Sequence, residues 1–171
     1  MYREGRFDPD IWKILDDEAP FPEAGFGMVS LARWKTDQTH LKATGKPLGL
    51  VLTAGDDPEP IAGDLHTFRV IALDFPKFAD GRSYSTARLL RERFRYTGEL
   101  RAVGDVLIDQ IPLMQRCGFD AFAITHEPTI RGLEAGDLPD VPFYTQPIAD
   151  RGEVPIGSRP WLRVPADTRQ V

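Results

Sequence analysis

The stretch Phe68-Arg-Val-Ile-Ala-Leu73, with the loop Asp74–Gly81 and the segment Tyr84–Tyr96 behind it, decides the fold of this chain. Residues 68–73 form a short, mostly apolar run, which predicts a buried strand. In the segment 84–96, apolar side chains recur at helical spacing at Ala87, Leu90 and Phe94. A strand, a loop and a helix in this order make one βα unit.

The same alternation of short strands and helices continues on both sides of this unit. Upstream, Ser30 is expected to cap a helix that ends at Gly45, and a strand over residues 48–53 follows. Further helices are expected from Asp57 to about residue 65, over 107–117, where Pro112 either kinks the helix or starts a second segment, and over 129–135. Further strands are expected over residues 99–103, 121–124 and 142–146. The pattern predicts an α/β fold with a mostly parallel sheet, either an incomplete TIM-barrel-like sheet or an open doubly wound one.

The length of 171 residues suits one hydrophobic core. It is well short of the roughly 250 residues of a complete (β/α)₈ barrel. Beyond Ala149 the glycine and proline content rises and the periodicity disappears. We therefore expect a single α/β domain over residues 1–148 and an extended C-terminal arm over residues 149–171.

Composition excludes several classes of function. The net charge is −5 and the pI is about 5.2, so no overall positive field favours a nucleic acid or an anionic membrane as partner. No segment approaches the ~18 consecutive apolar residues that indicate a membrane span. A single cysteine, Cys117, excludes an intrachain disulfide and a Cys-x-x-Cys pair. We expect a cytoplasmic protein without nucleic-acid or membrane partners.

A candidate anion site lies in the loop before the helix 84–96. Cationic Lys77 and Arg82 stand close in sequence to the hydroxyls of Ser83 and Ser85, at a helix start. Backbone N–H groups at a helix start, together with such side chains, attract phosphate, sulfate, sulfite or carboxylate. The alternative is that Ser83 is an ordinary N-cap and both cations are solvated.

Two carboxylates follow neighbouring strands of the predicted sheet. Asp74 and Asp105 are expected to project from corresponding strand ends, an arrangement that suits an acid/base pair or a Mg²⁺ site. The alternative is that Asp105 only caps the next helix. We assign no metal ligands, because three histidines lie far apart in sequence without metal-ligand spacing: His40, His66 and His126.

A row of arginines follows the helix 84–96. Arg88, Arg91 and Arg95 are expected to share one face at positions i, i+3 and i+7. Such a row is either a solvated face or a docking surface for an acidic protein partner, which would make association sensitive to salt.

The chain also resembles a known family over about a third of its length. The resemblance rests on Asp74-Phe-Pro-Lys-Phe-Ala-Asp-Gly-Arg-Ser-Tyr-Ser-Thr-Ala-Arg-Leu-Leu-Arg-Glu-Arg93, Gly98-Glu-Leu-Arg-Ala-Val-Gly-Asp-Val-Leu-Ile-Asp-Gln110 and Arg116-Cys-Gly-Phe-Asp-Ala-Phe122. Upstream, Leu31-Ala-Arg-Trp34 is similar too. These segments resemble a bacterial family of unknown function whose members are commonly labelled probable oxidoreductases of sulfite reduction. Genes of that family typically lie beside those for the sulfite reductase haemoprotein and for adenylyl-sulfate or phosphoadenylyl-sulfate reductase.

The resemblance implies an accessory protein of assimilatory sulfate and sulfite reduction. Such a protein is expected to bind the sulfite reductase haemoprotein or its electron donor, and to hold a small anionic ligand through the loop 77–85. A second hypothesis is a small α/β enzyme, an oxidoreductase or acid/base catalyst, that acts on a phosphorylated or sulfur-oxyanion substrate through Asp74 or Asp105. A third is a homo-oligomer whose C-terminal arm exchanges between subunits. No cofactor motif is recognisable, while a noncovalently bound flavin stays compatible with the sequence.

Overall fold

The computed structural model describes residues 1–23, 25–141, 153–156 and 159–165. Its strands are β1 (Tyr2–Arg3), β2 (Arg6–Phe7), β3 (Trp12–Ile14), β4 (Phe26–Ser30), β5 (Leu48–Leu52), β6 (Phe68–Phe75), β7 (Glu99–Gly104), β8 (Ala121–Phe122), β9 (Glu153–Ile156) and β10 (Arg159–Pro165). Its helices are α1 (Leu31–Ala43), α2 (Arg82–Arg88), α3 (Ile111–Arg116) and α4 (Glu127–Glu134). Two 3₁₀ segments, η1 (Glu59–Thr67) and η3 (Ile108–Gln110), and a π-helical segment, η2 (Leu89–Arg93), complete the elements.

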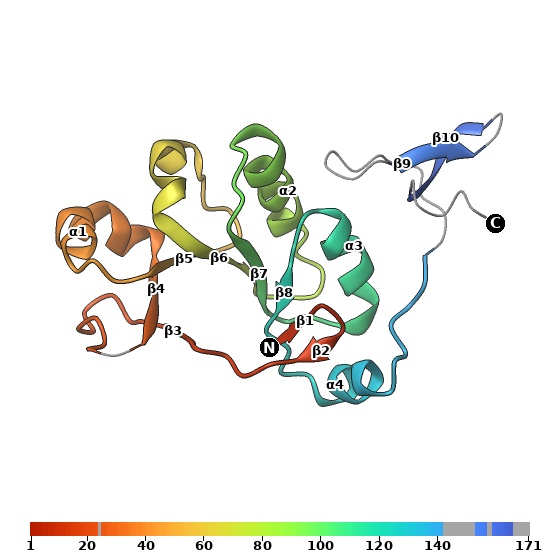
Figure 1. The fold of residues 1–171 in the computed structure, drawn as a ribbon, viewed down its shortest axis with the longest axis horizontal. Helices are drawn as coiled ribbons and strands as arrows, with labels where there is room; N and C mark the ends of the chain where they lie inside the picture. The colour runs from red at the N-terminus through yellow and green to blue at the C-terminus, as the bar shows by residue number, and fades with distance from the viewer. Residues whose placement is uncertain (24, 142–152, 157–158, 166–171) are drawn as a thin grey trace.

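Eight strands form one mixed, mostly parallel sheet in the order β2-β1-β8-β7-β6-β5-β4-β3. Strands β3 to β8 are parallel and stand in sequence order, whereas β1 joins β8 and β2 antiparallel. A doubly wound sheet requires a reversal of strand order, so that alternative is wrong. The sheet curls like half of a barrel, and α1, α2 and α3 lie on one side of it (Figure 1).

The main core fills the space between the sheet and these helices. Alternate residues of the strands face it, so that Leu50, Ile71 and Leu100 are fully buried. Trp34 of α1 packs edge-on against Phe68 of β6, with ring centroids 4.6 Å apart. The opposite, concave face of the sheet carries a smaller apolar cluster of Met28, Val70, Ala72 and Val103. The curled sheet therefore has one face covered by helices and a second, smaller apolar surface on its concave side.

Most of the predicted βα units are present close to their expected positions. The hydroxyl of Ser30 accepts a hydrogen bond of 3.0 Å from the backbone N–H of Arg33, as expected for the cap of α1. Of the two alternatives for Pro112, the second is confirmed: the 3₁₀ segment η3 comes first, and Pro112 lies in the first turn of α3. Proline fits there because the first-turn N–H groups of a helix have no intrahelical partner.

The helix predicted over residues 84–96 differs from expectation. It begins at Arg82, changes to a π-helical turn at Leu89, and ends at Phe94, whose N–H donates to the carbonyl of Leu89. A π turn holds more residues than an α turn and therefore shifts the side-chain positions that follow it. The common face predicted for Arg88, Arg91 and Arg95 is thus wrong.

Two predictions about the C-terminal region lie outside the described residues, namely the edge strand 142–146 and the domain boundary at residue 148. Beyond them, β9 and β10 pair antiparallel in a separate two-stranded sheet. Among the described residues, no helix has both the length and the apolar character needed to cross a membrane.

Candidate functional site

The two predicted carboxylates lie at the carboxyl ends of neighbouring strands. Asp74 stands opposite Val103 in the register of β6 and β7, and Asp105 directly follows β7. The Asp105 carboxylate accepts a hydrogen bond of 3.0 Å from the backbone N–H of Phe78, and the Asp105 N–H donates to the carbonyl of Phe75 at 2.7 Å. Asp105 therefore holds the loop that follows β6 against the end of β7.

The side chain of Asp74 is less exposed to solvent than that of Asp105. Burial raises the pKa of its carboxyl above 3.8, and the negative charge of Asp80 raises it further. A Cβ atom at residue 104 would lie 2.7 Å from the Asp74 Oδ1 atom, so Gly104 leaves the space that this carboxyl needs. Among the predicted site residues, Asp74 has the raised pKa that general acids often show.

We expect a direct pH titration of Asp74, followed by NMR of its carboxyl carbon, to give a pKa above 3.8. The folded protein then holds this proton more tightly than the unfolded chain. Stability from this group consequently falls as the pH rises from 3.8 to the folded pKa, and the loss is complete above it. Asp80→Asn should move the folded pKa down, because it removes a nearby negative charge. An unchanged pKa of Asp74 in that variant would contradict the contribution of the Asp80 charge.

The predicted anion-site residues do not form one site. Arg82 donates to both carboxylate oxygens of Asp80, at 2.9 and 2.6 Å, and these bonds lower the Asp80 pKa to about 2. Ser83 is 2% exposed, and its hydroxyl donates to the carbonyl of Asp74 at 2.6 Å. The N-cap of α2 is Gly81 and not Ser83. Two further predicted residues, Lys77 and Ser85, are exposed. The hydroxyl of Ser83 and the cation of Arg82 thus stabilise the loop itself.

The three arginines of the predicted docking surface have different surroundings. Arg88 pairs with Glu92 one turn later on the helix, at 2.6 Å. The Arg91 side chain is 13% exposed and donates to backbone carbonyls. Arg95 is exposed and has a positive φ of 53° after the helix end. The structure therefore places Arg91 inside the fold, while Arg88 and Arg95 lie nearer the surface.

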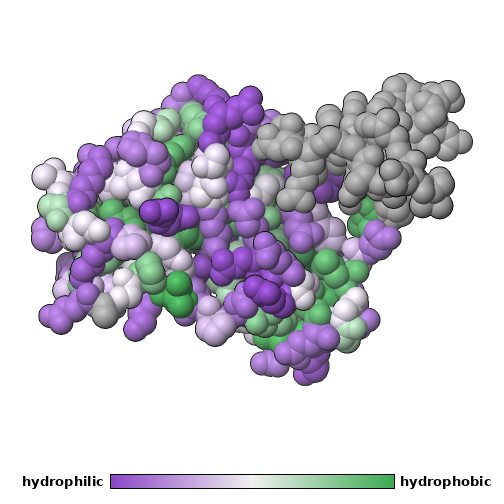
Figure 2. Space-filling view, viewed as in Figure 1, coloured by the Kyte–Doolittle hydropathy of each residue, from purple (hydrophilic) through white to green (hydrophobic). Residues whose placement is uncertain are grey.

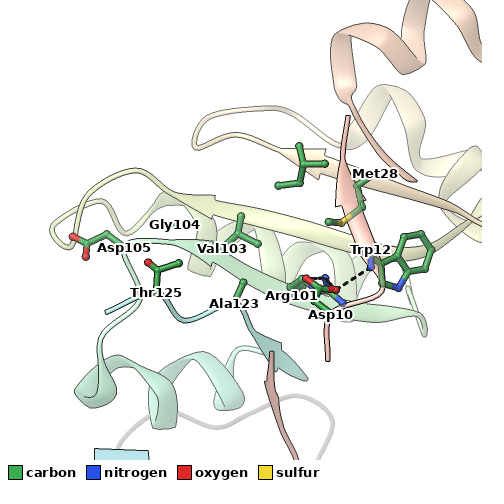
Figure 3. A pocket seen from close by; sticks show the side chains of 10 residues that line it. Asp10, Trp12, Met28, Arg101, Val103, Gly104, Asp105, Ala123 and Thr125 are labelled. Atoms are coloured by element: carbon green, nitrogen blue, oxygen red, sulfur yellow. Dashed lines mark hydrogen bonds and ion pairs between the residues drawn. The ribbon is translucent and has the colours of Figure 1, made fainter. Parts of the chain in front are cut away.

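A cavity of about 660 Å³ lies on the concave face of the sheet (Figure 3). The cavity is lined by β3, β4 and β7, by the residues that follow β7 and β8, and by the residue at position 10 before β3. The lining residues are Asp10, Trp12, Ile14, Met28, Arg101, Val103, Gly104, Asp105, Ala123 and Thr125. Gly49 on β5 lies close against the apolar side chains of the concave face. A Cβ atom at residue 49 would lie 2.5 Å from the Met28 side chain and 2.7 Å from the Val70 side chain. The cavity therefore combines an apolar wall with polar groups at its two ends.

Arg101 is the buried charge of this cavity. Its side chain is 1% exposed, although it stands in the middle of β7. Its Nε atom lies 2.9 Å from Glu99 Oε1, and its NH1 atom lies 2.9 and 3.0 Å from the two carboxylate oxygens of Asp10. Arg3 lies 3.0 Å from the other oxygen of Glu99. Two cations and two anions thus form one network across the concave face.

Sequence reasoning assigned no role to Arg101, Asp10, Trp12 or Thr125. An arginine between the apolar residues of a strand is a usable signal, since burying a charge requires partners. Asp10 and Trp12 come before Ser30, where no predicted element placed them beside β7. Only the strand order brings these residues together.

A second pocket, of about 640 Å³, lies at the opposite ends of β6 and β7, between the end of η1 and the turn before β7. Hydrophilic side chains cover most of the face shown in Figure 2, and apolar ones form separate groups between them. Large apolar side chains that are at least 40% exposed include Ile11, Ile14, Phe78, Leu113 and Val141. Ile14 also lines the cavity. Within the described ranges, no group of three or more His, Cys, Asp or Glu side chains is placed to hold a metal ion.

Comparison with known proteins identifies a family for this chain. Residues 49–151, more than half of the chain, match a family model described as a bacterial protein of unknown function (DUF934). No curated protein matches the chain. The matched range contains Arg101, Asp105, Ala123 and Thr125 of the cavity, while Asp10 and Trp12 lie outside it.

Proposed function

Because the chain belongs to this bacterial family of unknown function, DUF934, we propose a function from its structure and its sequence resemblance together. The protein is a cytoplasmic accessory protein of assimilatory sulfate and sulfite reduction. It binds a small anionic ligand in the cavity on the concave face. Its protein partner is the sulfite reductase haemoprotein or the electron donor of that enzyme.

The cavity is the observation that carries the proposal. Its volume of about 660 Å³ falls within the range of small-molecule sites, roughly 300–1,000 Å³. Asp105 and Thr125 line it just beyond the carboxyl ends of β7 and β8. In parallel α/β sheets, ligands bind beyond the carboxyl ends of the strands. A mostly apolar wall with a few polar groups is typical of sites that bind small organic molecules.

The pathway and the partner rest on the resemblance of residues 73–124 to proteins encoded beside sulfite reductase. An acidic surface on that partner would suit Arg88, at the end of α2, and Arg95, which is exposed just after η2. Arg91 is left out of this surface, because its donors are used inside the fold.

A second candidate function is acid/base catalysis on a phosphorylated or sulfur-oxyanion substrate. The observation that favours it is the raised pKa of Asp74 at the carboxyl end of β6, next to the strand that Asp105 follows. Turnover that is lost in Asp74→Asn while ligand binding is kept would support this candidate over a purely binding role.

Gene deletion with complementation tests the proposed function. The deletion strain is expected to fail on sulfate and on sulfite as sole sulfur source and to grow on cysteine. The wild-type gene should restore growth. Ala123→Phe should not, because its ring occupies the cavity, whereas Ala43→Phe at the exposed end of α1 should.

Both variants are first checked for wild-type thermal stability, so that a growth defect reports on the cavity. Growth of the deletion strain on sulfite would contradict the pathway. Full complementation by Ala123→Phe would contradict the role of the cavity.

A further inference from the structure

A short segment crosses the concave face. Residues 8–11, here called the strap, connect β2 and β3, which are the two edge strands of the eight-stranded sheet. The strap runs on the side of the sheet opposite α1, α2 and α3 (Figure 1). From it, the carboxylate of Asp10 reaches the guanidinium of Arg101 (Figure 3).

The two carboxylates on Arg101 are held in different ways. Glu99 belongs to the same strand as Arg101, is 17% exposed, and also pairs with Arg3. Asp10 belongs to the strap and is 35% exposed; among the described residues, its other hydrogen bond comes from the backbone N–H of Trp12 at 3.0 Å. Glu99 is thus a fixed partner of Arg101, whereas Asp10 is held only through a surface segment.

The charges of the network indicate which group is exchangeable. Arg101 and Arg3 face Glu99 and Asp10, so the network is neutral while Asp10 is in place. Without Asp10, a buried cation lacks one of its partners, and such a charge strongly favours any anion that can reach it. Arg101 lines the cavity but is 1% exposed while Asp10 is in place, so an anion bound there reaches the guanidinium when Asp10 moves away.

We propose that Arg101 is the anion-binding residue of the cavity and that Asp10 is its intramolecular competitor. The ligand carries an oxyanion, a carboxylate or a sulfonate, on an apolar body. Its oxyanion takes the place of the Asp10 carboxylate on the NH1 atom of Arg101, and the strap is released. This inference rests on the proposed function of the cavity as a ligand site.

The shape and charge of the cavity fit such a ligand. Next to Arg101 the wall is made of the side chains of Trp12, Met28, Val103 and Ala123, which suit an apolar body. Asp105 stands at the other end and has the same charge as the ligand, so the oxyanion is favoured at the Arg101 end (Figure 3). Arginine suits this role because its planar guanidinium binds oxyanions through two N–H groups.

Binding of two anionic probes and one neutral counterpart tests the inference. Benzenesulfonate supplies the oxyanion and the apolar ring, benzoate replaces the sulfonate by a carboxylate, and benzyl alcohol is the neutral counterpart. Affinity is measured by NMR titration of the Trp12 indole N–H signal, which Trp12→Phe identifies. Asp10→Asn is expected to bind benzenesulfonate and benzoate about tenfold more tightly than the wild type, because the competing charge is gone.

Two variants serve as controls. Asp8→Asn removes the same charge from the same strap without touching Arg101, and it should bind as the wild type does. Arg101→Met should bind benzenesulfonate no better than benzyl alcohol. Should Arg101→Met fold poorly, Arg101→Lys keeps the charge and is expected to retain part of the preference for the anion.

The outcomes separate this inference from the proposed function. Equal affinities of wild type and Asp10→Asn for both anions would overturn the inference, as would an anion preference that survives in Arg101→Met. If benzyl alcohol still binds in those cases and Ala123→Phe abolishes its binding, the cavity remains a ligand site. If no probe binds to any variant, the ligand role of the cavity fails as well.

Discussion

Replacing Arg91 with alanine is expected to lower the free energy of unfolding by about 3–5 kcal/mol. The Nε atom of Arg91 donates to the carbonyl of Gly118 at 3.0 Å, and its NH1 atom donates to the carbonyls of Tyr96 and Gly98 at 2.7 and 2.8 Å. Its NH2 atom pairs with the carboxylate of Asp120. The side chain is 13% exposed, so the loss leaves several poorly solvated acceptors without a donor.

Urea unfolding of Arg91→Ala beside Arg88→Ala measures this effect against a matched arginine of the same helix. Arg88 is 40% exposed and pairs with Glu92, which is 37% exposed, so its loss should cost about 0.5 kcal/mol or less. Similar midpoints for the two variants would show that Arg91 is solvated, as the sequence pattern alone allowed. They would then restore Arg91 to the candidate docking surface.

Gly104→Ala is expected to destabilise the protein by more than about 3 kcal/mol. Residue 104 has φ +92°, where a side chain is strained, and its Cβ atom would lie 2.4 Å from the backbone carbonyl oxygen of Phe75. That oxygen accepts the N–H of Asp105, which anchors the end of β7 to β6. Relief of the clash would therefore separate the carboxyl ends of the two strands.

Gly136→Ala is the matched control for this prediction. Gly136 has φ +80°, and a Cβ atom there meets nothing within 4 Å. It should lose about 1 kcal/mol from backbone strain alone. The difference between the two variants in thermal or urea unfolding then measures the steric contact at residue 104. Equal losses would contradict the close approach of β6 and β7 at this point.

Local sequence patterns predicted the βα units because their signals act over a few residues. The cap at Ser30 and the apolar run before Asp74 each specify an element without reference to distant parts of the chain. The π turn at Leu89 escaped prediction, because the same apolar spacing fits a regular α-helix. The structure shows it through the hydrogen bond from the Phe94 N–H to the carbonyl of Leu89, five residues earlier.

The site could be predicted only in part for a related reason. Asp74 and Asp105 were placed correctly at strand ends, since the ends of parallel strands meet at one edge of a sheet. Their proposed roles stay predictions. The cavity depends on contacts between Asp10 and Arg101, which are separated by 91 residues, and no local pattern encodes such a pairing.

The pairing of β1 with β8 sets a condition on how the chain reaches this arrangement during synthesis. Tyr2 aligns with Phe7 of β2 and with Phe122 of β8, so the β1–β2 hairpin has no place in the larger sheet until β8 has left the ribosome. The parallel units from β4 to β7 are able to associate earlier, since each neighbours the next in sequence. The β1–β2 hairpin is therefore among the last parts to join the sheet, although β3 can pair with β4 early.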